Sequence, residues 1–239
     1  MQSSSLSMNI AILDSGVGGQ SILAGLKKVA SQHHYTYFAD HKNFPYSTKS
    51  VQELQKIAEE NVSQLIAEGA ELIVIACNTL TVAALDQLRK TFPTIPFIGT
   101  VPPVKKAADT LPPSAKIIVV STKHTAKSQY LKNLIQQHSK GQQFISIGTT
   151  QLVKAVENND SDQAQHILKE LFAPYSKQRV SAVIIGCTHF SFVKQEIRNC
   201  FPYPIQIFDS VEGITKQLQR ITKNESIIQT GLSPSFCCS

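Results

Sequence analysis

The stretch Glu71–Arg89 reads ELIVIACNTLTVAALDQLR. Its first part is a run of aliphatic residues that leads to Cys77, and its second part places apolar residues at helical spacing up to Arg89. A strand that is apolar at every position is expected to be covered on both faces, which is typical of parallel sheets. The stretch therefore predicts a strand, a turn at Cys77 and a helix, the building unit of an α/β protein.

The same pattern recurs later in the chain. Residues Ser181–Arg198 read SAVIIGCTHFSFVKQEIR, again an aliphatic run, a small residue, a cysteine, a hydroxyl-bearing residue and a helical segment that ends on arginine. A fainter similarity links IAILDSGVGGQSIL (10–23) with IIVVSTKHTAKSQYL (117–131). Two related halves are therefore predicted, with proline-rich linkers near Pro93–Pro103 and Pro202–Pro204.

Short β-branched apolar runs alternate with amphipathic segments such as Ser50–Glu68, which predicts parallel sheets flanked by helices. The predicted strands are Asn9–Leu13, Tyr35–Ala39, Leu72–Ala76, Phe97–Ile98, Lys116–Val120, Phe144–Ile147, Val180–Ile185 and Ile205–Phe208. Such sheets bind ligands at the carboxyl ends of their strands. The residues found there are Asp14-Ser15, Asp40, Cys77-Asn78-Thr79, Ser121-Thr122, Cys187-Thr188-His189 and Asp209-Ser210.

The composition is that of a globular protein: 239 residues, 42% of them hydrophobic, with a net charge of +6. No apolar run approaches the ~20 residues that span a bilayer, and the opening MQSSSLSMNIAIL lacks the pattern of a signal peptide. Basic residues are scattered without aromatic interleaving, which predicts a solvated surface and argues against nucleic-acid binding. We expect a cytoplasmic protein without a membrane partner.

The chain has five cysteines, at positions 77, 187, 200, 237 and 238. Their odd number and the absence of a C-x-x-C pair fit neither a closed disulfide framework nor a structural zinc site. Thiols in a reducing compartment, with no bound metal, are the simpler interpretation. The sequence assigns no role to Cys200, Cys237 or Cys238.

Cys77 and Cys187 occupy matching places in the repeat, where a strand ends and a helix begins. Exposed helix N–H groups and the helix dipole can stabilise a thiolate there, although a lone cysteine is also commonly a small buried apolar residue. If the two halves face each other, the thiols reach one cleft from opposite sides. One thiolate could then remove a proton from a carbon centre while the other thiol protonates the opposite face.

Asp14 and His189 are the natural assistants of the two thiols. Asp14 follows the first predicted strand, and His189 lies two residues after Cys187. A role in the DSGVGG turn or in helix capping is the alternative for each of them. Gly16, Gly18 and Gly19 would let the backbone approach an anionic group, but neither a P-loop nor a full G-x-G-x-x-G motif supports nucleotide binding. Neutral donors and acceptors for a zwitterionic ligand follow the same strands: Ser15, Tyr46, Ser47, Asn78, Thr79 and Thr188.

Four motifs together resemble glutamate racemase, within the wider aspartate/glutamate racemase superfamily. They are DSGVGG (14–19), FADHKNFPYS (38–47), ACNT (76–79) and GCTH (186–189), and the resemblance runs from about Asn9 to about Gln219. It implies interconversion of L- and D-glutamate without pyridoxal phosphate, metal or other cofactor, supplying D-glutamate for peptidoglycan. It also implies a homodimer and two pseudo-symmetric α/β domains, residues 8–98 with 210–239 and residues 99–209, with the active site in the cleft between them.

The resemblance also implies a role for individual residues. Cys77 would take the proton from D-glutamate and Cys187 from L-glutamate, supported by Asp14 and His189 respectively, with Glu157 near the site. The implied substrate contacts are Asp14, Ser15, Pro45, Tyr46, Ser47, Cys77, Asn78, Thr79, Thr125, Cys187 and Thr188.

Three departures from the family pattern bear on substrate preference. Ser47 and His124 stand where glycine is usual, and Thr149-Thr150 replaces a Cys-Pro pair. Ser47 could alter the backbone against a substrate carboxylate, and His124 could narrow the pocket. The alternatives are a racemase of aspartate or another amino acid, a hydrolase using Cys187 and His189, and a non-catalytic binding relative.

Overall fold

The computed structural model describes residues 7–223. Its eight strands are β1 (Asn9–Asp14), β2 (His34–Ala39), β3 (Leu72–Ile75), β4 (Phe97–Gly99), β5 (Lys116–Ser121), β6 (Gln143–Gly148), β7 (Ala182–Gly186) and β8 (Gln206–Phe208). Its α-helices are α1 (Gln20–Val29), α2 (Val51–Ala67), α3 (Asn78–Thr91), α4 (Val104–Thr110), α5 (Lys123–Lys127), α6 (Gln129–His138), α7 (Gln151–Glu157), α8 (Ser161–Phe172), α9 (Lys194–Asn199) and α10 (Val211–Lys223). Three 3-10 helices complete it: η1 (His41–Asn43), η2 (Tyr46–Thr48) and η3 (Thr188–Val193).

The strands form two four-stranded, wholly parallel sheets, with the orders β2-β1-β3-β4 and β6-β5-β7-β8. The prediction of an α/β protein with two parallel sheets flanked by helices is confirmed. The two orders are the same when β5 to β8 are matched to β1 to β4. Cys77, which follows β3, and Cys187, which follows β7, therefore occupy equivalent places in the two sheets.

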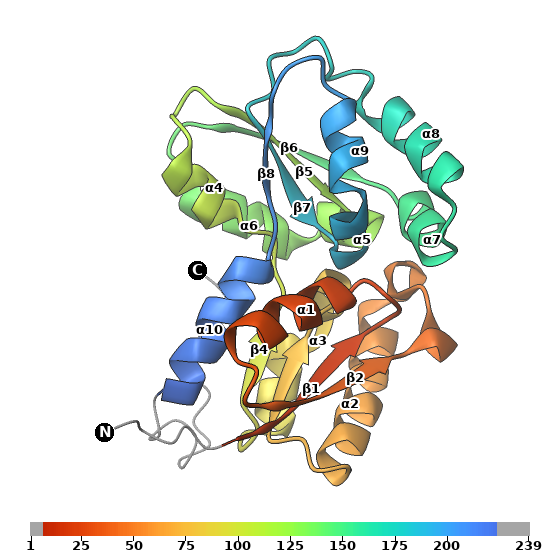
Figure 1. Ribbon diagram of the computed structural model, residues 1–239, viewed down its shortest axis with the longest axis vertical. Coiled ribbons are helices and arrows are strands. Elements are labelled where there is room, and N and C mark those ends of the chain that lie inside the picture. Colours follow the sequence, from red (N-terminus) through yellow and green to blue (C-terminus); the bar gives the residue numbers. More distant parts are fainter. Residues whose placement is uncertain (1–6, 224–239) are drawn as a thin grey trace. The chain divides into compact units, whose positions relative to one another are not determined.

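The first sheet is covered on both faces, as its apolar strands require. Ala11 and Leu13 of β1 pack toward α2 and α3, whereas the alternating Ile10 and Ile12 pack toward α1 and α10. Figure 1 shows α10, from the far end of the described chain, lying beside α1. The sheet is thus closed by a helix that enters long after its strands.

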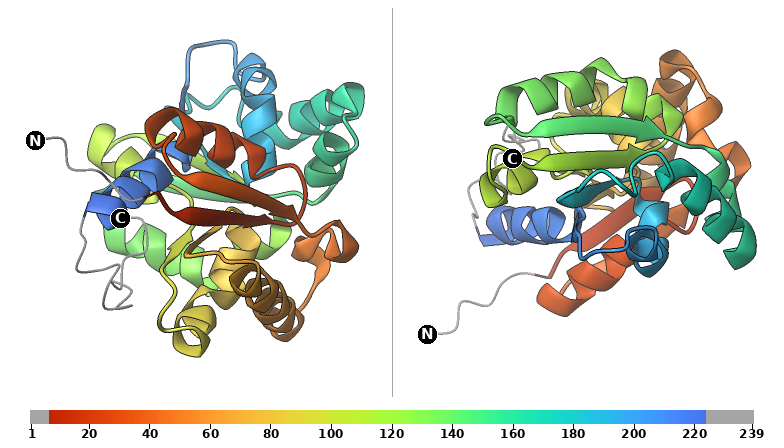
Figure 2. Two further views of the ribbon diagram at one scale, coloured as in Figure 1. Left: turned by 60° about the horizontal axis from the view of Figure 1, so that its bottom comes forward. Right: turned by 90° about the horizontal axis from the view of Figure 1, so that it is seen from above.

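The second sheet is also sandwiched between helices. Ile117 and Val119 of β5 pack toward α4 and α6, while Phe172 of α8 contacts Phe201, which follows α9, with ring centroids 5.3 Å apart. The right panel of Figure 2 shows α4 and α6 on one side of this sheet and the helices α8 and α9 on the other. Its central strands β5 and β7 are accordingly buried on both faces.

The described residues form two compact units, 7–101 with 211–223 and 102–210. The last part of the segment expected at 210–239, with Cys237 and Cys238, lies outside the described residues. Within residues 7–223, no helix is long and apolar enough to cross a membrane.

Helix α2 shows how local sequence sets the elements. Ser50 is its N-cap, and a capping box is complete because Ser50 Oγ accepts from Glu53 N while Glu53 Oε2 accepts from Ser50 N. After the helix, Gly69 takes a φ of 93°, a left-handed conformation suited to glycine. The expected helical segment Ser50–Glu68 is therefore Val51–Ala67 flanked by its caps.

The turn after Cys187 differs from the expected one. Instead of an α-helix it continues as the 3-10 helix η3, and α9 begins only at Lys194. The 3-10 repeat of about three residues per turn places Cys187, Phe190 and Val193 in register, and all three are buried. Thr188 and His189 between them are buried as well, so nearly the whole turn faces the interior.

Candidate functional site

The carboxyl edge of the first sheet gathers the predicted polar residues of that unit. Backbone hydrogen bonds align the strand ends: Ala76 N donates to Leu13 O at 2.8 Å, and Asp40 N donates to Asp14 O at 2.9 Å. Thr100 N reaches Ile75 O at 3.1 Å in the same way. The residues that follow β1, β2, β3 and β4 thus share one edge.

Cys77 is the N-cap of α3, and its side chain makes no capping hydrogen bond. The thiol is 8% exposed and stands at the amino end of a 14-residue helix, where the dipole favours negative charge. Asn78, the next residue, is 2% exposed, and neither its amide nitrogen nor its amide oxygen finds a partner among the described residues. A buried amide without partners is costly, so it points to a ligand that completes its hydrogen bonds.

Asp14 is fully buried at the end of β1, and its Oδ2 accepts a hydrogen bond from Gly16 N at 3.1 Å. The loop that follows packs tightly against this edge. A Cβ on Gly19 would lie 2.8 Å from Ala76 Cβ and 3.0 Å from Asp14 Cβ, which is closer than real side chains approach. Gly19 is therefore required for the loop to lie against the end of β3.

Tyr46 and Ser47 lie in η2, close to this edge. Tyr46 is 1% exposed and packs in the same apolar cluster as Cys77. Burial raises the pKa of Tyr46, as do the negative charges of Asp40, Cys77 and Asp14, so the phenol stays protonated. Ser47 Oγ is buried and has no partner among the described residues, which suits it to a ligand contact.

The backbone at Ser47 bears on the serine that stands where the family usually has glycine. Within residues 7–223, Asn159 is the one residue other than glycine with a positive φ. Ser47 therefore takes a conformation open to any residue, and its place does not require glycine.

The tyrosine hydroxyl is held by Asp40, which follows β2. Tyr46 OH donates to Asp40 Oδ2 at 2.8 Å, and Asn61 Nδ2 of α2 donates to the same oxygen at 2.9 Å. Burial opposes ionisation of Asp40, but the hydrogen bonds from Asn61, Asn43 and Tyr46 outweigh it and lower the pKa of this carboxyl. Asp40 is thus an ionised, hydrogen-bonded group beneath the loop that carries Tyr46.

The carboxyl edge of the second sheet holds Cys187 and its predicted assistants. Cys187 is 6% exposed, and its Sγ lies 4.0 Å from His189 Nδ1. The other ring nitrogen of His189, Nε2, lies 2.7 Å from Glu157 Oε2 of α7. The side chains of His189 and Glu157 are 3% and 11% exposed, so the structure brings thiol, imidazole and carboxylate into one buried line.

The threonines of the second unit lie in the turns after the strands. Thr122 caps α5 by accepting from Thr125 N at 3.2 Å, and the hydroxyls of Thr122 and Thr125 are 3.1 Å apart. Thr125 and Thr188 are both buried. His124, on the same short helix, is half-buried, and burial lowers its pKa, which favours the neutral imidazole.

Two polar residues of these edges escaped the sequence-based reasoning. Thr100 follows β4, is fully buried, and its hydroxyl has no partner among the described residues. The three-residue strand before it was the only available signal. Asn61 lies on the apolar face of α2, between Ala58 and Leu65, and a polar residue within such a stripe was the signal for its buried role.

The described residues contain no group of three or more His, Cys, Asp and Glu side chains arranged to hold a metal ion. Cys77, Cys187 and Cys200 are all present as thiols. The chemical groups at the two strand edges are therefore thiols, one imidazole, carboxylates and neutral hydrogen-bonding side chains.

Comparison with known proteins agrees with the resemblance seen in the motifs. The chain is 34% identical to the glutamate racemase of Clostridium acetobutylicum over 224 residues, 93% of this chain and 87% of that protein. It is 37% identical to the glutamate racemase of Campylobacter curvus over 218 residues, 88% of this chain and 82% of that protein.

A solved structure extends the agreement to the fold. The crystal structure of Escherichia coli glutamate racemase, in complex with L-glutamate and the activator UDP-MurNAc-ala, matches with a TM-score of 0.85 and 26% identity. The match covers 96% of this chain and 85% of that one. The family model for Asp/Glu/Hydantoin racemases matches residues 19–218. The chain belongs to the Asp/Glu/Hydantoin racemase family, and glutamate racemases are among its relatives there.

Proposed function

We propose that this chain is a glutamate racemase, an isomerase that interconverts L- and D-glutamate through the thiols of Cys77 and Cys187. The observation that carries the proposal is that these cysteines follow equivalent strands, β3 and β7, of two sheets with the same strand order. Glutamate is proposed as the substrate because the relatives from Clostridium acetobutylicum and Campylobacter curvus, at 34% and 37% identity, are glutamate racemases.

The proposed reaction moves two protons in one turnover. The thiolate of Cys77 takes the α-proton of D-glutamate, and the thiol of Cys187 gives a proton to the opposite face of the same carbon, which yields L-glutamate. In the reverse direction Cys187 is the base and Cys77 the acid. The reaction requires both thiols to reach one carbon, from opposite faces. No redox change occurs, and no cofactor is needed for the proton balance.

Each thiol has its own support. The amino end of α3 favours the Cys77 thiolate, and the pair of His189 and Glu157 serves Cys187. Asp14, at the end of the neighbouring strand β1, is the proposed assistant of Cys77. The α-proton of an amino acid is a very weak acid, so donors must also stabilise the carbanionic transition state in a site that excludes water.

The remaining predicted residues bind the substrate. Glutamate carries two carboxylates that need donors and an ammonium that needs acceptors. The buried hydroxyl of Ser47 and the amide of Asn78 have no partners among the described residues, so a ligand would complete their hydrogen bonds. The other proposed contacts are Asp14, Ser15, Pro45, Tyr46, Thr79, Thr125 and Thr188.

The biological setting proposed with this activity follows the family. The enzyme would act in the cytoplasm as a homodimer and supply D-glutamate for peptidoglycan. The second candidate function is racemisation of aspartate, which His124 and Thr149-Thr150 keep open because they alter the family pattern. Turnover of glutamate and aspartate under the same conditions separates the two.

The decisive experiment incubates each glutamate enantiomer with the purified protein in D2O. Circular dichroism of the solution follows inversion, and mass spectrometry follows entry of deuterium at the α-carbon. We expect the wild type to invert both enantiomers and Cys77→Ala and Cys187→Ala to lose racemisation. Cys200→Ala is the matched control, since the third described thiol follows α9 and its Sγ donates to Glu196 O of that helix.

The outcomes separate the alternatives. Racemisation that survives in both Cys77→Ala and Cys187→Ala contradicts the two-thiol reaction. A hydrolase that uses Cys187 and His189 would retain its activity in Cys77→Ala. A non-catalytic binding relative would incorporate no deuterium from solvent into either enantiomer.

A further inference from the structure

We propose that Asp40 is a positioning residue for the substrate. It acts through Tyr46, by holding the loop 41–48 against the end of β2 and the middle of α2. The inference rests on the proposed function, because it assigns Tyr46 and its neighbours to the substrate site. Asp40 itself touches no reacting atom in this proposal.

One carboxylate joins four elements of the fold. Asp40 Oδ1 accepts from the backbone and side-chain nitrogens of Asn43, at 3.3 and 3.1 Å. Its Oδ2 accepts from Asn43 Nδ2 at 2.9 Å, from Tyr46 OH at 2.8 Å and from Asn61 Nδ2 at 2.9 Å. The end of β2, both 3-10 turns of the loop and the middle of α2 are therefore tied to a single side chain.

The arrangement also fixes the direction of the tyrosine hydroxyl. Asn61 Nδ2 lies 3.3 Å from Tyr46 OH, so the hydroxyl can accept from Asn61 while it donates to Asp40. Asp40 is 5% exposed, and a buried carboxylate is tolerated only when donors surround it. Charge-assisted bonds of this kind are stronger than neutral ones, which makes Asp40 the dominant anchor of the loop.

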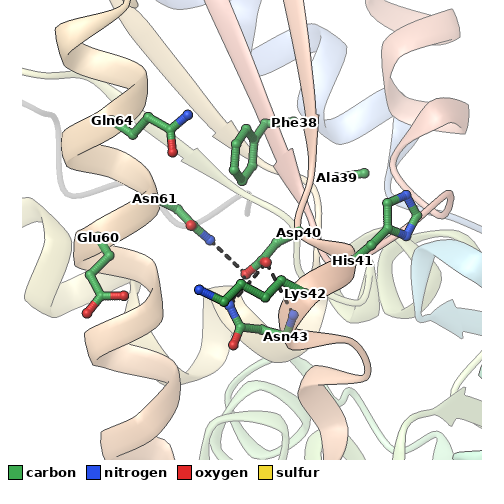
Figure 3. Close-up of a pocket in the computed structure, with 9 residues that line it drawn as sticks. All are labelled: Phe38, Ala39, Asp40, His41, Lys42, Asn43, Glu60, Asn61 and Gln64. Carbon is green, nitrogen blue, oxygen red and sulfur yellow. Dashed lines mark hydrogen bonds between the residues drawn. The ribbon is translucent and has the colours of Figure 1, made fainter.

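A pocket of about 360 Å³ opens beside this carboxylate, between the end of β2 and α2. Figure 3 shows the side chain of Asp40 in its wall, with dashed hydrogen bonds to Asn43 and Asn61. Protein donors already satisfy both carboxylate oxygens. The carboxylate is therefore an internal anchor and not a free group offered to a ligand of the pocket.

The anchor matters for the substrate because of what the loop carries. Tyr46 packs in the same buried cluster as Cys77, and Pro45 and Ser47 flank it in the chain. A loosened Tyr46 would displace both neighbours from the substrate while the cysteine, on α3, keeps its place. Such a change weakens binding in the ground and transition states alike, which raises KM and leaves kcat nearly unchanged.

The test compares Asp40→Asn, Tyr46→Phe and the double variant. An asparagine at position 40 offers one acceptor oxygen and an NH2 group that opposes the donors around it, so at least part of the network is lost. We expect KM for glutamate to rise about tenfold in Asp40→Asn, with kcat changed by less than about threefold. In the double variant KM should rise by clearly less than the product of the two single effects, because Tyr46→Phe has already removed the bond by which Asp40 holds Tyr46.

Hydrogen exchange of peptides covering 41–49 supplies a readout that does not depend on turnover. The loop should lose protection in Asp40→Asn, while peptides of α8 keep theirs. Asp160→Asn is the matched control, since Asp160 is also an N-cap carboxylate and accepts from Gln163 N in the other unit. It should change neither the KM nor the protection of the loop.

Three results would overturn the inference. They are unchanged loop protection in Asp40→Asn, KM effects that simply multiply in the double variant, and a loss of kcat at unchanged KM. If the wild type fails to racemise glutamate, the proposed function falls, and the exchange measurement still decides whether Asp40 holds the loop.

Discussion

Replacing Glu157 with glutamine removes a negative charge beside His189 with little change of volume. In the structure Glu157 Oε2 lies 2.7 Å from His189 Nε2, and both side chains are almost fully buried. Solvent therefore does little to screen the interaction, unlike that of a surface pair. An ionised carboxylate can only accept a hydrogen bond, so Nε2–H of His189 donates to Glu157 and Nδ1 faces Cys187 Sγ at 4.0 Å.

The expected magnitude follows from the kind of hydrogen bond that is lost. A bond to a charged group is worth about 1 to 1.5 kcal/mol more than a neutral one, and the glutamine oxygen can still accept from His189. An imidazolium beside Cys187 loses that support, so the thiolate is less favoured. We expect kcat/KM of Glu157→Gln to fall about tenfold, because each 1.36 kcal/mol corresponds to a tenfold change in rate.

The assay measures racemisation in both directions and deuterium entry into each enantiomer. The two enantiomers have equal free energies in water, so kcat/KM must fall by the same factor from either side. Deuterium entry distinguishes the two bases. Entry into L-glutamate, which Cys187 deprotonates, should fall, whereas entry into D-glutamate, which Cys77 deprotonates, should persist. Glu170→Gln is the control, because Glu170 pairs with His166 at 3.3 Å on the exposed surface.

A kcat/KM of Glu157→Gln equal to that of the wild type would show that the carboxylate does not support His189 in the reaction. A fall of exchange into D-glutamate without one into L-glutamate would show that Glu157 and His189 serve the other base.

Three further predictions concern stability. Gly19→Ala should lower the free energy of unfolding by about 1–3 kcal/mol in urea and abolish turnover, because the new Cβ would meet Ala76 and Asp14. Gly69→Ala should also lower the stability, because φ is 93° there, but it should keep activity, since open space surrounds that position. Ser50→Ala should cost about 1 kcal/mol in the same assay by removing the cap of α2, and an unchanged unfolding midpoint would contradict the capping role. Burial lowers the pKa of His33, whose Nδ1 accepts from Met8 N, so the unfolded chain binds more protons and this contribution to stability is lost as the pH falls below about 6.5. His33→Asn should reduce the difference between urea midpoints at pH 7.5 and pH 5.5, and an equal difference in both proteins would argue against it.

The central strands were predictable because burial on both faces leaves a plain mark on the sequence. In β3 all four residues, Leu72–Ile75, are buried, and the predicted run Leu72–Ala76 differs from it by one residue. The order of the strands within each sheet was not predictable in this way. Periodicity reports that a residue is buried, but it does not identify the neighbouring strand.

The site was predictable where chemistry follows directly after a strand. Cys77 and Cys187 could be found from the strand runs and the repeat, whereas Glu157 was found only through resemblance to the family. Its bond to His189 joins residues 32 positions apart, and tertiary packing alone creates that contact. Asn61 and Thr100 were missed for related reasons: Asn61 serves the site from the middle of a helix, and Thr100 follows a strand of three residues.

The two thiols stand at equivalent places, but their surroundings differ. Tyr46 lies within reach of the charges of both Cys77 and Asp14, whereas Cys187 lies beside His189, which pairs with Glu157. Racemisation explains such a mixture: the two bases must act on mirror-related faces of one carbon, while the carboxylates and ammonium of the substrate stay bound in one place. Equal free energies of the enantiomers then force the pH profiles of kcat/KM to coincide in the two directions. The profiles of kcat, which report groups in each enzyme–substrate complex, are under no such constraint and should differ between L- and D-glutamate. Coincident kcat profiles at every pH would mean that the two thiols are chemically equivalent in the complex, against the different partners that the structure gives them.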